Sequence, residues 1–175
     1  MNGNFRSEDW ERSRERAVAV APQDVADFVR TRLGMDLDPK QEELLRTMGN
    51  RVLLNCTRQW GKSTTAASVA VCRAYRVPGS LVLVASPTKR QSAELVRKAA
   101  GFLRQLGIKP VGDGDNETSL QLPNGSRIVG LPGTESTIRG FSSVSLLLID
   151  EAARVTDAMY KALRPCWRWV AGTCG

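Results

Sequence analysis

The sequence contains no histidine, which excludes Ser-His and Cys-His catalysis within this chain. Its four cysteines, Cys56, Cys72, Cys166 and Cys174, form no CxxC pair. We therefore expect reduced thiols in a cytoplasm, and neither a structural zinc site nor a disulfide framework. No apolar stretch approaches membrane-spanning length and the N-terminus is polar, so we expect no signal peptide, anchor or membrane partner.

Acidic residues are the scarcer charged class: 18 Asp and Glu stand against 25 Lys and Arg, a net charge of +7. That excess favours acidic partners such as nucleic acid or nucleotides. It is concentrated in one helical segment whose basic residues face only Glu94, namely Lys89, Arg90, Arg97, Lys98 and Arg104. This helix either follows phosphates on DNA or is an ordinary solvated face, and both interpretations stay open.

The pattern of apolar segments predicts an α/β fold with a substantial core in its 175 residues. Strands are expected at 51–56, 81–86 and 146–150, and helices at 7–33, 38–49, 61–77 and 91–106. Asn124-Gly125, within an alternating stretch, predicts a β-hairpin. Short apolar strands separated by helices indicate a mainly parallel sheet flanked by helices, with the hairpin as an insertion or an antiparallel edge.

The stretch "NCTRQWGKSTTAA" (55–67) follows the first predicted strand and leads into a helix. Gly61-Lys62-Ser63 suits a phosphate-binding loop, in which backbone N–H groups and a helix N-terminus face anionic oxygens. The lysine reaches the outer phosphates and the hydroxyl ligates magnesium. Cys56 stands where such loops usually have their first glycine, and a small side chain fits there. Alone, the triplet also occurs by chance.

The stretch "LLLIDEA" adds a second, independent indication, because Asp150 and Glu151 leave the carboxyl end of an apolar strand. Ligands of open α/β sheets bind at that edge. Asp150 is expected to hold Mg²⁺ together with Ser63, and Glu151 to orient and deprotonate an attacking water. An isolated Asp-Glu pair would equally serve as a helix N-cap. With the loop, it predicts a P-loop NTPase that binds ATP and Mg²⁺.

These motifs resemble the ATPase domain of the large terminase subunit, the motor that packages DNA into phage-type capsids. The resemblance covers about residues 36–165 and is carried by "CTRQWGKST" and "LLLIDEAA"; "DPKQ", "ASPTKRQSAEL" and "STIRGFS" support it. It implies that Gln41 reads the adenine base and that Arg58 or Arg139 stabilises charge on the γ-phosphate. The nucleotide-binding set is then Gln41, Cys56, Thr57, Arg58, Gln59, Trp60, Gly61, Lys62, Ser63 and Thr64. Each of these three residues also has a purely structural interpretation. Trp60 would pack in the core, Arg58 would form a salt bridge between loop and helix, and Arg139 would be an ordinary turn residue.

The same resemblance implies partners and a location. Double-stranded DNA, a small terminase subunit, a portal and a homo-oligomeric ring are implied for the intact family member, in the cytoplasm of a bacterial host.

The end of the chain departs from the family pattern at "LRPCWRWVAGTCG". We divide the sequence into a helical leader (1–35), a partial ATPase core (36–165) and an aberrant tail (166–175). One back-translation of the tail, shifted by a base, encodes Met-Leu-Ala-Val-Gly-Gly-Gly, which suggests a frameshift after Arg164; a natural end or a deliberate truncation are the alternatives. The sheet would then be incomplete at its C-terminal end, with an unpaired edge, and we expect weak or absent ATP turnover.

Two other functions stay open. A helicase-type ATPase fragment fits "SPTKRQ" and "DEAA", although a helicase needs a second motor domain. The second open function is that of a non-catalytic fragment, which binds nucleotide or joins motor rings.

Overall fold

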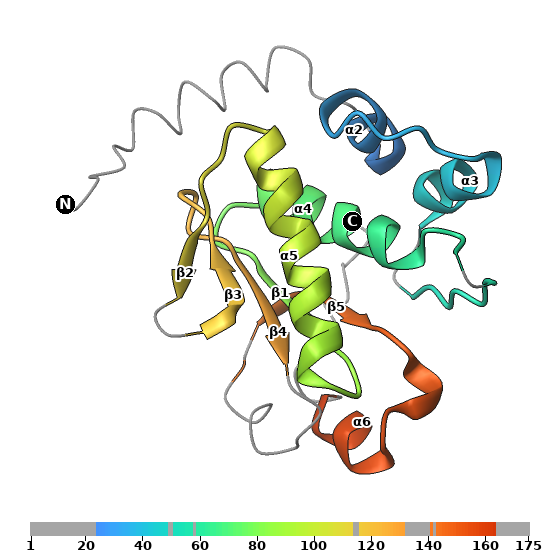
Figure 1. Ribbon diagram of the computed structural model, residues 1–175, viewed down its shortest axis with the longest axis vertical. Helices are drawn as coiled ribbons and strands as arrows, with labels where there is room; N and C mark the ends of the chain where they lie inside the picture. Colours follow the sequence, from blue (N-terminus) through green and yellow to red (C-terminus); the bar gives the residue numbers. More distant parts are fainter. Residues whose placement is uncertain are drawn as a thin grey trace, which may run out of the picture.

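The computed structural model describes residues 24–48, 51–57, 59–113, 116–131, 141 and 143–163 (Figure 1). The helices are α2 (Val25–Arg32), α3 (Pro39–Thr47), α4 (Lys62–Arg76), α5 (Lys89–Gln105), the short 3-10 turn η2 (Ala152–Arg154) and α6 (Asp157–Leu163). The strands are β1 (Leu81–Ala85), β2 (Val111–Asp113), β3 (Asn116–Gln121), β4 (Arg127–Leu131) and β5 (Val144–Ile149). The predicted tail lies outside the described residues, as does most of the predicted leader.

The strands form one sheet in the order β2-β3-β4-β1-β5. β1 pairs in parallel with both β4 and β5, whereas β3 pairs antiparallel with β2 and β4. The hairpin turn between β3 and β4 falls at Asn124-Gly125 as predicted, and Gly125 adopts a φ of 80° that favours glycine. The hairpin is therefore the antiparallel side of a mainly parallel sheet, which confirms the predicted α/β fold.

Helices cover both faces of this sheet, and β1 shows how. Val82 and Val84 pack into a cluster with α2, α3, α4 and α5, while Leu83 and Ala85 pack on the other face against Met159 and Leu163 of α6. All four β1 side chains are fully buried. An apolar strand without alternation is what burial on two faces requires. In Figure 1, α5 crosses one face of the sheet, and α2 and α3 lie beyond α4.

The helix α3 begins as the sequence predicted. Asp38 is the N-cap, its carboxylate accepts hydrogen bonds from the backbone N–H groups of Lys40 and Gln41, and Pro39 is the first helical residue. A charged cluster then joins α3 to α2: Glu42 accepts from Arg30 and Arg46, and Arg46 also pairs with Asp24 and Asp27. Among the described residues, none of the helices combines the length and the apolar character needed to span a membrane.

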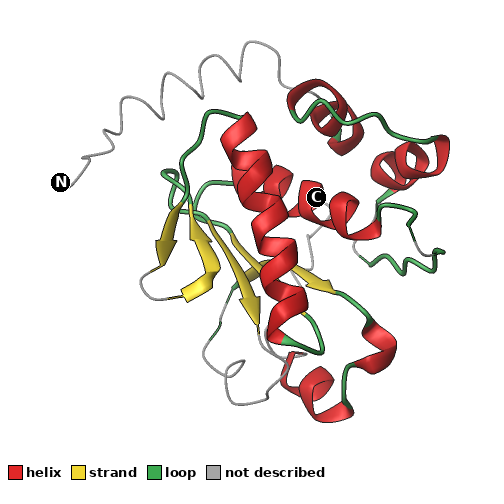
Figure 2. Ribbon diagram, in the orientation of Figure 1, coloured by secondary structure: helices red, strands yellow, loops and turns green. Residues whose placement is uncertain are grey.

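The predicted strand at 51–56 is wrong. Arg51–Thr57 has no regular secondary structure, and Figure 2 shows it as a loop that leads towards α4. Its side chains are not buried as predicted: Leu53 is 87% exposed and Val52 45%. The reason is that a strand needs a neighbour for its backbone N–H and C=O groups, and no strand of the sheet pairs with this segment. A run of apolar, β-forming residues indicates that a segment can form a strand, but it does not specify a strand with which the segment pairs.

The strand β5 lies at the edge of the sheet and pairs only with β1. Each of its six residues is half-buried, in contrast to residues 82–85 of the neighbouring β1, which are fully buried. Within the described residues its outer edge is unpaired, as we expected from the sequence. Apolar side chains and free backbone groups therefore remain accessible next to the segment that carries Asp150.

Candidate nucleotide-binding site

The two predicted motifs meet at one rim of the sheet. Lys62 is the first residue of α4 and Asp150 directly follows β5, and the Lys62 Nζ lies 3.4 Å from the Asp150 Oδ1. The Asp150 side chain is 17% exposed and that of Lys62 39%, so the pair is accessible from one side. The Asp150 backbone is fixed in turn, because its N–H donates to the Ala85 carbonyl at 2.9 Å. The expected convergence of these two groups is confirmed.

Gly61 makes the turn into α4, and the position requires glycine. Its φ of 86° lies in the left-handed region, where side chains are strained. A Cβ at this position would also stand 3.0 Å from the Gln41 Nε2. Gln59, two residues earlier, has a φ of 67° as well. The loop therefore bends sharply twice just before the helix, which brings its backbone round to the N-terminus of α4.

The N-terminus of α4 has no side-chain cap. The N–H groups of Thr64 and Thr65 both donate to the Gly61 carbonyl at 2.9 Å, so they are engaged within the helix. The first-turn N–H groups before them, on Lys62 and Ser63, are those that a helix leaves unsatisfied. Together with the positive end of the helix dipole and the Lys62 ammonium, they form an electropositive position suited to a phosphate.

Glu151 lies beside this position with an unusual backbone. Its φ of 49° is left-handed, which is uncommon for a residue with a side chain and is often found at functional sites. Arg154 Nη1 lies 3.4 Å from the Glu151 Oε2, and the Glu151 backbone N–H donates to the Asp150 Oδ1 at 3.0 Å. The Gln91 side chain, more than Arg154 or Lys62, lowers the pKa of Glu151 from its ordinary value. A lowered pKa favours the carboxylate form of Glu151 and makes it a weaker proton acceptor than an ordinary glutamate.

Gln41 does not point freely outward. It is buried, and its Nε2 donates to the Trp60 carbonyl at 2.8 Å while its Oε1 accepts from the Asp38 N–H at 3.2 Å. The side chain thus joins the start of α3 to the phosphate-loop candidate. Its predicted contact with an adenine base stays a prediction.

The remaining predicted site residues divide into two groups. Cys56 and Thr57 belong to the irregular segment before the loop, whereas Ser63 and Thr64 lie in the first turn of α4 next to Lys62. Arg58 and Arg139, the two candidates for γ-phosphate contact, lie outside the described residues, and their roles stay predictions.

The loop that connects β1 to α5 also lies at this rim, although none of its residues was predicted to belong to the site. Ser86 directly follows β1, is fully buried, and its hydroxyl has no hydrogen-bond partner among the described residues. The Gln91 side chain, in the first turn of α5, lowers the pKa of Glu151. The signal was present, because "SPTKRQ" follows a parallel strand at the same carboxyl rim as Asp150. In the sequence analysis, the stretch supported only the family resemblance and the helicase alternative.

The oxygen ligands at this rim fit magnesium. Within the described ranges, no three His, Cys, Asp or Glu side chains gather into a metal site. Mg²⁺ in phosphoryl-transfer sites needs fewer, because it takes one or two protein oxygens and fills its other positions with phosphate and water. The Asp150 carboxylate beside Lys62, with the Ser63 hydroxyl on the next residue, supplies a set of that kind.

Solved structures share this fold. The chain resembles the large terminase ATPase domain of Thermus phage P74-26 with a TM-score of 0.65 and 18% sequence identity, over 82% of this chain and 66% of that one. A variant of the same domain with an arginine-to-alanine substitution matches with a TM-score of 0.64, at the same identity and coverage. The chain thus spans slightly less than two thirds of the length of these structures. At this identity, the likeness shows the fold.

The sequence comparisons add a family. No curated protein matches the chain. The model of the family described as "RNA cytidine acetyltransferase NAT10/TcmA, helicase domain" matches residues 53–174, which include both the phosphate loop and the Asp-Glu strand. Both comparisons indicate an ATPase-type module. The chain belongs to the NAT10/TcmA helicase-domain family, and its fold is that of a phage large terminase ATPase domain.

Proposed function

We propose that this chain is the ATP-binding and ATP-hydrolysing motor module of a DNA-packaging terminase. The observation that carries the proposal is the contact of Lys62 with Asp150, which brings the phosphate loop and the acidic pair to one rim of the sheet. The likeness of the fold to a terminase ATPase domain supports the same assignment. Its setting would be the cytoplasm of a bacterial host.

Each group at the rim has a role in this proposal. Lys62 and the first-turn N–H groups of α4 bind the outer phosphates, and Ser63 and Asp150 hold Mg²⁺. The metal, when bound, neutralises charge on the phosphate oxygens. Glu151 orients a water molecule and accepts its proton. Arg58 or Arg139 stabilises the charge that develops on the γ-phosphate, from the same subunit or from a neighbour in a ring.

We further propose that hydrolysis by this chain alone is slow. The loop that binds phosphate is most effective when a paired strand fixes its first residues. Within the described part of the chain, residues 51–57 lie outside the sheet and the outer edge of β5 is unpaired. Imperfect positioning of the reacting groups lowers the rate strongly even where binding persists.

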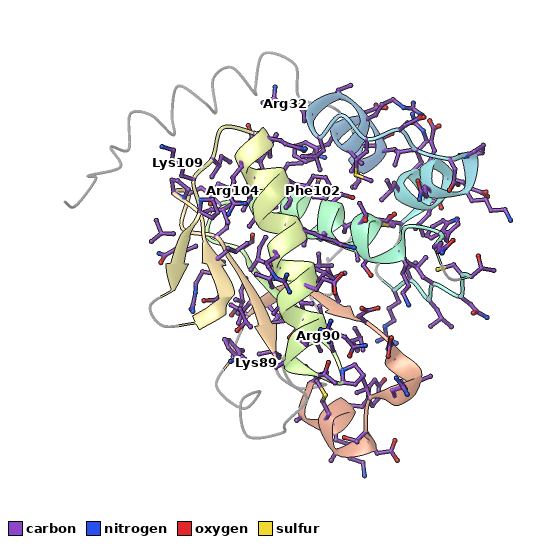
Figure 3. The ribbon with its side chains drawn as sticks, in the orientation of Figure 1. Arg32, Lys89, Arg90, Phe102, Arg104 and Lys109 are labelled. Atoms are coloured by element: carbon purple, nitrogen blue, oxygen red, sulfur yellow. The ribbon has the colours of Figure 1, made fainter. Side chains whose placement is uncertain are left out.

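The proposed DNA surface is the exposed face of α5. Arg90, Arg97 and Arg104 are exposed and lie seven residues apart, hence on one side of the helix and about 10.5 Å from one to the next. Figure 3 labels Lys89 and Arg90 near the start of α5 and Arg104 near its end. Evenly spaced arginines suit the repeating phosphates of a duplex. A small subunit, a portal and ring neighbours remain proposed partners of the complete motor.

A helicase-type ATPase is the second candidate, and the family match favours it. In that case a single-stranded nucleic acid, rather than a packaged duplex, is the polymer that stimulates hydrolysis. A third candidate is a non-catalytic module that binds nucleotide without turning it over.

Three measurements on the 175-residue chain separate these functions. Equilibrium titration with a fluorescent ATP analogue, with and without Mg²⁺, tests nucleotide binding. Single-turnover hydrolysis with protein in excess over radiolabelled ATP detects slow chemistry. Addition of duplex DNA or of single-stranded RNA then shows which polymer raises the rate. Stimulation by duplex DNA supports the packaging motor, whereas absence of ATP binding contradicts all three candidates.

A further inference from the structure

Ser86 and Asp150 lie side by side at the rim of the sheet. Ala85, the last residue of β1, is in register with Ile149, the last residue of β5. The Asp150 N–H donates to the Ala85 carbonyl at 2.9 Å, so the parallel ladder continues as far as Asp150. Ser86 and Asp150 are therefore the next pair in register, on strand ends that a sheet holds about 4.8 Å apart.

Both side chains leave the sheet on the face that α4 covers. The registered pair Val84 and Leu148 packs into the cluster that contains residues of α4. Side chains alternate between the two faces of a strand, so two residues further along Ser86 and Asp150 return to this same face. The contact of Asp150 with Lys62, the first residue of α4, agrees with that placement.

The Ser86 hydroxyl is unsatisfied in the ligand-free protein. The residue is fully buried, and its Oγ has no hydrogen-bond partner within the part of the chain that the structure describes. A buried hydroxyl without a partner lowers the stability of a fold. Such groups are rare in native structures, and a catalytic role or a bound water or ion is a common explanation for them.

The Asp150 carboxylate, in contrast, loses a partner when a nucleotide binds. Its Oδ1 accepts from the Glu151 N–H at 3.0 Å and lies 3.4 Å from the Lys62 Nζ. In the proposed function, Lys62 turns to phosphate oxygens and the carboxylate holds Mg²⁺. Carboxylates that ligate a metal are themselves hydrogen-bonded, which fixes their orientation. The neighbouring Ser86 hydroxyl can supply this hydrogen bond by rotating about its side-chain torsions.

We propose that Ser86 is a positioning residue, which donates its hydroxyl hydrogen to the Asp150 carboxylate when Lys62 turns to the nucleotide, and so orients Asp150 for Mg²⁺. This inference rests on the proposed ATPase function. Ser86 contacts neither the nucleotide nor the metal; it acts through Asp150. Removal of its hydroxyl lowers the affinity for Mg²⁺ and preserves nucleotide binding without the metal, because Lys62 and the first turn of α4 still bind the phosphates.

The experiment compares Ser86→Ala with Ser119→Ala in titrations of a fluorescent ATP analogue at increasing Mg²⁺. Ser119 is the matched control, because its buried hydroxyl is also unpaired among the described residues, but it lies in β3, which two strands separate from β5. For Ser86→Ala we expect the half-saturating Mg²⁺ concentration to rise about tenfold, with unchanged affinity for the analogue in EDTA. For Ser119→Ala we expect no change in either.

Melting without ligand tests the starting point of the inference. Each variant removes an unpaired buried hydroxyl, so both should melt at or above the temperature of the wild type. A lower melting temperature for Ser86→Ala would show that its hydroxyl already has a stabilising partner, which overturns the role. A wild-type dependence on Mg²⁺ in Ser86→Ala also overturns it.

Asp150→Asn tests whether Ser86 acts through Asp150. In the Asp150→Asn background, Ser86→Ala should have no further effect on the Mg²⁺ dependence. An equal loss in both backgrounds means that Ser86 acts independently of Asp150, and overturns its role alone. A wild-type chain that does not bind the analogue, or binds it regardless of Mg²⁺, overturns the proposed function and this role with it.

Discussion

The Lys62 ammonium and the Asp150 carboxylate lie 3.4 Å apart, although they come from two elements well separated along the chain. In the ligand-free protein each neutralises the other. An accessible ion pair of this kind is held weakly, so a polyphosphate with its magnesium ion can exchange both partners. In the proposed function, Lys62 then binds phosphate oxygens and Asp150 the metal. The ion pair holds these two proposed ligand-binding groups together at one place.

The first prediction concerns Lys62. Lys62→Ala should weaken binding of a fluorescent ATP analogue at least about tenfold, because it removes a charge-assisted contact to the outer phosphates. Lys161→Ala, on the exposed side of α6, is the matched control and should bind like the wild type. Equal affinity in the two variants would show that the nucleotide does not bind at the start of α4.

Substitution of Gly61 should damage the loop through its backbone. Gly61→Ala forces a side chain into a left-handed conformation, at a cost of about 1–2 kcal/mol, and drives its Cβ against the Gln41 amide. We expect a lower melting temperature together with weaker ATP binding. Gly101→Ala is the control, since a Cβ there meets no atom within 4 Å and alanine favours the helix. A Gly61→Ala variant as stable as Gly101→Ala would contradict the loop geometry.

Gln41 should matter for stability whether or not it contacts a base. Gln41→Leu leaves the partly buried Trp60 carbonyl and the Asp38 N–H without their side-chain partner, which should lower the free energy of unfolding by about 1–3 kcal/mol. Urea unfolding measures this directly, with the exposed Lys40→Ala on the same helix as the control. Indistinguishable midpoints would mean that Gln41 does not join α3 to the loop.

The charged cluster between α2 and α3 predicts a pH dependence. Hydrogen bonds from Arg30 and then Arg46 lower the pKa of Glu42 below 4.5. The folded pKa is depressed, so the stabilisation is present above pH 4.5 and is lost as the pH falls through the lower folded value. Glu42→Gln should therefore melt below the wild type at pH 7, with the two curves converging in acid. Because the arginines are exposed, high salt should also reduce the difference. A gap that is independent of pH would point to packing instead of charge.

Features that depend on neighbouring residues in the sequence, such as helix caps and turns, could be predicted, and so could one pair of residues in the site. Asp38 caps α3 and Asn124-Gly125 turns the hairpin because both depend on residues close by in the sequence. Lys62 and Asp150 were also predictable as a pair, since a loop before a helix and an acid after a parallel strand come to the same rim of such a sheet.

Other features that depend on contacts between segments distant in the sequence could not be predicted from the sequence. The residues 51–56 have strand propensity, yet whether they form a strand depends on a neighbour that the sheet does not provide. The closeness of the β1–α5 loop to Asp150 and Glu151 depends on β1 and β5 being adjacent, and the sequence alone did not specify the strand order. The roles of Arg58 and Arg139 stay predictions from the family resemblance.

A double-mutant cycle on Lys62 and Asp150 tests the central claim most directly. The affinity for ATP in the presence of Mg²⁺ is measured for the wild type, Lys62→Ala, Asp150→Asn and the double variant. If both residues serve one bound nucleotide, each single change weakens binding and the double variant loses much less than the product of the two losses. Losses that multiply would mean that the two groups act independently, and unchanged affinity in all variants would mean that this rim is not the nucleotide site.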